Sequence, residues 1–162
     1  MSEVPQFLKA NERYAASFTK GHLPMPPARQ VAIVACMDAR LDPARVLGLE
    51  EGDAHVIRNA GGRAADAVRS LAISQQLLGT REVVVIHHTD CGMLTFTDAQ
   101  LRKKLHDGLG VDTELGFLPF TNLDVSVRDD VAAIRSSPLL MRDLPVSGFV
   151  YDVKTGRLRQ VV

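Results

Sequence analysis

The amino-acid sequence predicts an α/β fold: a single domain built on a mostly parallel central β-sheet that is flanked by helices. Three patterns favour this class. Short apolar segments rich in β-branched residues alternate with helical patterns, as in parallel sheets connected by crossover helices. These segments are apolar at consecutive positions, which is typical of strands buried on both faces. The chain ends with two short strand patterns joined by a turn, which predict an antiparallel edge hairpin.

Residues 1–27 predict a helix and an extended arm. A helical pattern covers about residues 5–18 and places Phe7, Tyr14 and Phe18 near one face. The Pro-rich stretch at 21–27 favours an extended link over a helix. The plainest account of this link is a segment that crosses to a partner subunit.

Buried strands are expected at 31–35 and 83–87, each a short apolar run, and 54–58 is a further strand candidate. The segment 42–48 predicts a short helix, with an Asp N-cap, Pro at its first position and a closing Gly. A longer helix is expected to begin at the pair Gly61-Gly62 and to end at Gly79, which supplies its C-terminal stop. The apolar face of that helix consists of Ala64, Val68, Leu71, Ala72 and Leu78.

Capping boxes predict two helices in the last third of the chain. Thr97 with Gln100 precedes a helix that is expected to bury Leu101 and Leu105, and a loop follows over 108–120.

The second capping box pairs Thr121 with Asp124. It leads into a helix whose apolar positions recur at helical spacing, at Val127, Val131 and Ile134. Beyond that helix, the segments 146–153 and 158–162 predict the terminal hairpin.

The bulk composition excludes several classes of protein. Lys and Arg total 19, as do Asp and Glu, whereas a general nucleic-acid binder would normally be basic. No apolar run approaches the about 20 residues that span a bilayer, and the N-terminus lacks a secretory pattern. We therefore expect a cytoplasmic protein that binds neither nucleic acid nor membrane. Its net charge of zero makes self-association easy.

Three metal-ligating residue types follow two of the expected strands. Cys36 comes directly after the first strand, and His88 and Cys91 follow the third. Ligands in open α/β sheets bind beyond the carboxyl ends of the strands, so these side chains converge if the two strands are neighbours. Two thiolates and an imidazole suit Zn²⁺, and a site with three protein ligands is typical of catalytic zinc.

Asp38 and Arg40 follow Cys36 at spacings that place them on its side of an extended segment. Arg40 would keep the Asp38 carboxylate ionised and oriented. The carboxylate then has two possible uses: it accepts a hydrogen bond from zinc-bound hydroxide, or it binds zinc itself. His87 points to the opposite face of its strand, so we interpret it as a packing or supporting residue.

Two other interpretations of the cysteines remain. Free cysteines are often inert buried thiols, and two of them could form a redox pair. The chain has no Cys-x-x-Cys motif, and His88 would have no role in either case. The pattern therefore favours the metal.

Three segments stand out, CMDAR at 36–40, HVIRNAGG at 55–62 and HTDCGM at 88–93. Together they resemble the β-class carbonic anhydrases, especially their small archaeal and actinobacterial branch. The resemblance extends through GTREVVVIHHTDCGM and the terminal SGFVYDVKTGRL, so it covers most of the chain.

The resemblance implies a zinc enzyme that hydrates CO₂ to bicarbonate. Cys36, His88 and Cys91 match the family's zinc ligands, and Asp38 matches the aspartate that orients the hydroxide or becomes the fourth ligand in a closed form. Arg40 matches the arginine that pairs with this aspartate. The remaining implications are a pocket wall made by the backbone of Asn59, Ala60 and Gly61, assembly as a homodimer or homotetramer, and an N-terminal region at 1–27 that packs on a partner.

Two alternatives to CO₂ hydration stay open. Some relatives of this fold use the same metal chemistry on carbon disulfide or carbonyl sulfide. A zinc-bearing scaffold protein is the other alternative, although a structural zinc does not need the Asp38–Arg40 pair.

Overall fold

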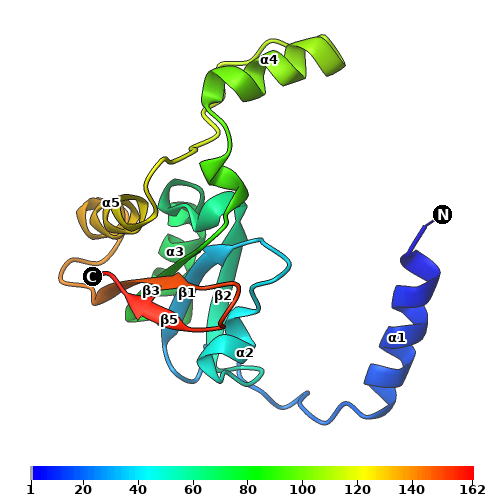
Figure 1. The fold of residues 1–162 in the computed structure, drawn as a ribbon. Coiled ribbons are helices and arrows are strands. Elements are labelled where there is room, and N and C mark those ends of the chain that lie inside the picture. The colour runs from blue at the N-terminus through cyan, green and yellow to red at the C-terminus, as the bar shows by residue number, and fades with distance from the viewer. Residues whose placement is uncertain (1) are drawn as a thin grey trace.

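The computed structural model describes residues 2–162 and is centred on a five-stranded sheet in the order β2-β1-β3-β4-β5 (Figure 1). Four strands run parallel, and the last pairs antiparallel with its neighbour. The strands are β1 (Val31–Cys36), β2 (Ala54–Asn59), β3 (Glu82–His88), β4 (Val146–Tyr151) and β5 (Leu158–Gln160). The predicted fold class, including the antiparallel edge, is confirmed.

Strands β1 and β3 are neighbours at the centre of the sheet. Every residue of β1 is buried, as its continuous apolar run predicts. In the register of the pair, Val31 lies opposite Glu82 and Ala35 opposite Ile86. The carboxyl ends of the two strands therefore meet at one edge of the sheet.

Two helices, α3 (Ala64–Leu78) and α5 (Leu123–Ser136), cover one face of the sheet. Leu71 of α3 and Val131 of α5 belong to a single buried cluster with the alternate residues of β1 and β3 that face them. The apolar face expected for α5, at Val127, Val131 and Ile134, is its buried face. The face expected for α3 is only partly correct, because Ala64 and Leu71 are buried while its other three members are half-buried. The buried face of α3 is completed by Ala67, Ser74 and Gln75. Its start also differs, because α3 begins at Ala64, after a short 3₁₀ turn, η1 (Ala60–Gly62), which contains the glycine pair.

The opposite face of the sheet is covered by shorter elements. These are α2 (Pro43–Leu47) and a second 3₁₀ turn, η2 (Gly92–Leu94). Asp42 caps α2 by accepting a hydrogen bond from the Arg45 amide, and Gly48 ends it in the left-handed conformation, as predicted.

Helices α1 (Val4–Ala16) and α4 (Asp98–Leu109) stand away from the sheet and its covering helices (Figure 1). Neither helix contains a buried residue. The prediction that Leu101 and Leu105 are buried is therefore wrong for this chain alone, where both are half-buried. Within residues 2–162, no helix is both long enough and apolar enough to cross a membrane.

One of the two predicted capping boxes is confirmed. Thr97 and Gln100 exchange both hydrogen bonds at the start of α4. The box assigned to Thr121 and Asp124 is wrong, because Asn122 caps α5 by accepting a hydrogen bond from the Val125 amide at 3.0 Å. Asn is at least as good an N-cap as Thr, and the helix starts one residue later than expected.

Candidate metal centre

Cys36, His88 and Cys91 converge at the carboxyl edge of the sheet. Cys36 ends β1, His88 ends β3, and Cys91 lies in the loop that follows. One ligand atom from each residue lies within 4.8 Å of the others, and all three residues are buried. The pairing of β1 with β3 therefore brings together groups that are far apart in the sequence.

The imidazole of His88 is oriented by its own loop. Its Nδ1 atom lies 2.8 Å from the Thr89 carbonyl, which can only accept, so Nδ1 carries the proton. The other ring nitrogen, Nε2, is buried and has no hydrogen-bond partner. A buried nitrogen with a free lone pair beside two sulfur atoms is what a metal-binding histidine requires.

The two thiols divide their acidity unequally. A hydrogen bond from Cys91 outweighs the effect of burial and lowers the pKa of the Cys36 thiol. The negative Cys36 sulfur and burial in turn raise the pKa of Cys91. A bound cation would release that second proton. Two sulfurs and an imidazole are a donor set that fits Zn²⁺.

Asp38 is held by Arg40 in a two-pronged pair. Arg40 donates from Nε to Asp38 Oδ1 at 3.0 Å and from Nη2 to Oδ2 at 2.8 Å. The Arg40 guanidinium thereby holds the pKa of Asp38 well below its usual range. Asp38 Oδ2 also lies 3.7 Å from His88 Nε2, so the carboxylate adjoins the metal-ligating atoms while both of its oxygens contact Arg40.

Two further residues organise this site, and reasoning from the sequence assigned neither of them this role. Arg58 of β2 donates to the main-chain carbonyls of Cys36 and Asp38, at 3.0 and 2.7 Å. Asp90 accepts a hydrogen bond from Arg40 Nη1 at 2.7 Å. Both lie inside the motifs HVIRNAGG and HTDCGM, but residue spacing alone does not show which backbone groups an arginine will reach.

A cavity of about 330 Å³ opens beside the cluster. Ala60 and Gly61 line it, whereas Asn59 turns away and pairs its side-chain amide with the main chain of Arg63. The full lining comprises Cys36, Met37, Asp38, Ala60, Gly61, Cys91, Gly92, Met93 and Phe96. The mixture of apolar walls with one carboxylate suits a small, weakly polar molecule.

His87 faces the other side of the sheet, as strand alternation predicts. Its Nδ1 lies 2.8 Å from the Ser126 hydroxyl, and its Nε2 lies 3.0 Å from the Asp130 carboxylate on α5. Arg63 approaches the same carboxylate at 3.0 Å. This buried group ties α5 to the sheet.

Comparison with known proteins places these features in one family. A family model described as carbonic anhydrase matches residues 31–113. The β-carbonic anhydrase 1 of Mycobacterium tuberculosis is 48% identical over 162 residues, which cover 99% of each chain. A carbonic anhydrase structure from Streptococcus mutans has a TM-score of 0.95 and 52% identity, and covers 100% of this chain and 99% of that one. A carbon disulfide hydrolase from Acidianus is 34% identical, covering 94% of this chain and 86% of the relative.

Proposed function

Because the chain belongs to the β-class carbonic anhydrase family, we propose that it catalyses the reversible hydration of CO₂ to bicarbonate and a proton. The proposed cofactor is a zinc ion held by Cys36, His88 and Cys91. The observation that carries the proposal is the convergence of these three donors beside an Asp–Arg pair and a mostly apolar cavity.

Zinc held by these three residues would supply Lewis acidity, which would make water a nucleophile at about pH 7. The rest of the reaction depends on the position of the substrates. CO₂ has no charge and no hydrogen-bond donor, so the apolar wall of the cavity is its natural binding surface. Its carbon gains the hydroxyl of a water molecule, and the remaining proton leaves to solvent.

Asp38 is the residue that orients the attacking water. Its Oδ2 atom lies next to the metal-ligating atoms and accepts a hydrogen bond from the water, which turns a lone pair toward the CO₂ carbon. The hydrogen bonds from Arg40 lower the pKa of Asp38 and so keep this carboxylate ionised. We infer that Ala60 and Gly61 contribute to the wall on which CO₂ lies.

The proposal is tested by exchange of ¹⁸O between labelled CO₂ and water, with zinc content measured on the same sample. Catalysed exchange by protein carrying one zinc per chain is expected. Zinc-loaded protein that leaves the uncatalysed exchange rate unchanged would contradict the proposed reaction.

Hydrolysis of carbon disulfide is a second candidate, favoured by the similarity to the Acidianus hydrolase. We favour CO₂ as the substrate, because the sequence identity of this chain to the mycobacterial β-carbonic anhydrase, 48%, is higher than its identity to the Acidianus hydrolase, 34%. Release of H₂S from CS₂ at a rate above that of CO₂ hydration would reverse this preference.

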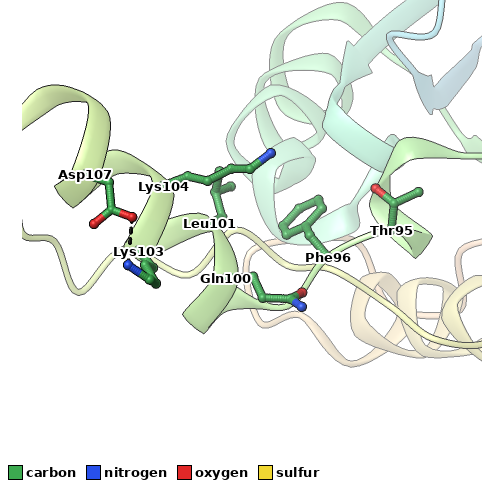
Figure 2. A pocket seen from close by; sticks show the side chains of 7 residues that line it. All are labelled: Thr95, Phe96, Gln100, Leu101, Lys103, Lys104 and Asp107. Atoms are coloured by element: carbon green, nitrogen blue, oxygen red, sulfur yellow. Dashed lines mark hydrogen bonds and ion pairs between the residues drawn. The ribbon is translucent and has the colours of Figure 1, made fainter.

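We propose further that the protein assembles as a homodimer or homotetramer, and that the region 1–27 packs on a partner. The exposed fractions of Phe7 and Leu8 on α1 are 64% and 62%. A cavity of about 490 Å³ between η2 and α4 offers an apolar surface at Phe96 and Leu101 (Figure 2). Phe96 also lines the cavity beside the metal centre, so a second copy on this surface would cover the site.

The assembly is tested with the double variant Phe7→Asp, Leu8→Asp, measured by light scattering. Both side chains are exposed in the isolated chain, so the substitutions should leave each subunit folded and shift the protein toward monomers. An unchanged molar mass would show that α1 takes no part in assembly. A cytoplasmic location stays a prediction from the sequence.

A further inference from the structure

Arg40 connects the two loops that carry the metal-ligating residues. Besides its pair with Asp38, it donates from Nη1 to the Asp90 carboxylate at 2.7 Å and from Nη2 to the Asp90 carbonyl at 3.0 Å. Asp38 and Arg40 follow β1, whereas Asp90 lies between His88 and Cys91 after β3. The guanidinium thus spans from one loop to the other.

Asp90 is presented to Arg40 by a firmly held segment. The preceding residue, Thr89, donates its amide to the Tyr151 carbonyl at 2.9 Å and accepts from the Val153 amide at 3.1 Å. Asp90 itself has a φ of 55°, in the left-handed region that Asn and Asp tolerate better than most residues. This backbone conformation accompanies the contact of both the carbonyl and the carboxylate of Asp90 with the same arginine.

Asp38 has two alternative partners within reach. It contacts Arg40 through both oxygens, but Oδ2 is only 3.7 Å from His88 Nε2 and therefore close to the position of a bound metal. Any contact that fixes Arg40 favours the Arg40-bound form of Asp38 over a metal-bound form.

We propose that Asp90 is a positioning residue that anchors Arg40 and thereby keeps Asp38 off the metal. The inference rests on the proposed metal site. It adds a residue that controls whether Asp38 binds the metal as a fourth ligand. The Asp90 side chain is 71% exposed, so its contribution should be modest. We expect loss of the carboxylate to increase the population in which Asp38 has left Arg40 by about twofold to fivefold.

The first test uses NMR of the Arg40 Nε–H group in metal-free protein. Asp90→Asn removes the charge but tolerates the left-handed backbone, and Asp90→Gly keeps only the carbonyl contact. Asp143→Asn is the matched control, because Asp143 has a φ of 57° and is exposed. Both Asp90 variants should accelerate exchange of this proton about twofold to fivefold, with no change in the control. An Arg40 signal as protected as in the wild type would overturn the proposal.

The second test uses the visible spectrum of the Co²⁺-loaded protein, which reports the ligands of the metal. Asp90→Asn should change this spectrum toward a form with an additional carboxylate ligand. The same substitution should have no effect in an Asp38→Asn background, where that carboxylate is missing. A spectral change of equal size in both backgrounds would show that Asp90 does not act through Asp38.

Neither readout depends on catalysis. If the wild-type protein failed to hydrate CO₂, the proposed function would fall, while the exchange of the Arg40 proton would still report whether Asp90 anchors that side chain.

Discussion

Gly62 offers a direct test of how the fold positions the metal centre. It has a φ of 68°, and a Cβ atom added there would lie 2.9 Å from the Cys36 amide nitrogen and 3.0 Å from the Ala35 carbonyl carbon. These are main-chain atoms of β1, which cannot swing aside as a flexible side chain would. Gly62→Ala therefore introduces both backbone strain and a steric clash at the base of Cys36.

The two costs have separate magnitudes. A non-glycine residue in the left-handed conformation costs about 1–2 kcal/mol. Overpacking a rigid interior costs about 1–3 kcal/mol more, so we expect Gly62→Ala to lower the free energy of unfolding by about 2–5 kcal/mol. For a protein of this size, that loss lowers the melting temperature by about 4–20 °C, at about 2–4 °C per kcal/mol.

Gly79→Ala is the matched control. Gly79 also has a positive φ, 76°, but nothing lies within 4 Å of the position of its Cβ. This variant should show the strain alone, about 1–2 kcal/mol. Urea unfolding of both metal-free variants, at one protein concentration, isolates the clash as the difference between them. A Gly62→Ala variant no less stable than Gly79→Ala would refute the conclusion that the glycine is required for close packing against β1.

Three further outcomes follow from the site. Asp38→Asn should retain zinc but lose about 100-fold or more in kcat/KM for CO₂ hydration, measured with the zinc content, because the attacking water loses its ionised carboxylate acceptor; near wild-type turnover would exclude the orienting role. Cys91→Ser should weaken zinc binding, measured by competition with a chelator. The loss should exceed about 10–100-fold, which is typical of removing a residue that only hydrogen-bonds to a ligand; unchanged affinity would remove Cys91 from the ligand set. Since Arg40 holds the pKa of Asp38 below the unfolded value of about 3.9, the stabilisation by this carboxylate is present above that pH and lost as the pH falls. Unfolding of metal-free wild type and Asp38→Asn should therefore show a stability difference that narrows from about pH 6 to about pH 3, and a constant difference would contradict the pairing.

The elements that carry the site were largely predictable from the sequence. The continuous β-branched run of β1 could be buried only between two layers, and the same reasoning applied to β3. Because the carboxyl ends of neighbouring parallel strands share an edge, the convergence of Cys36 with His88 was expected on the condition that these two strands are neighbours. The pairing of β1 with β3 meets that condition.

Other features depended on tertiary structure. Thr121 and Asn122 are both good caps, and local sequence does not decide between adjacent candidates. The periodic pattern of α4 showed which residues share a face but not whether anything covers it. The contact of Arg40 with Asp90 spans fifty positions and depends on one left-handed residue, which no periodicity reveals.

The most direct test of the central claim is stopped-flow CO₂ hydration by zinc-loaded protein, run from about pH 6.5 to 9 to bracket the pKa near 7 of water at such a metal. We expect a catalysed rate that rises with pH across this range and that falls to the uncatalysed rate when zinc is removed. A protein with one zinc per chain and no catalysed rate at any pH would contradict the assignment of this site to CO₂ hydration.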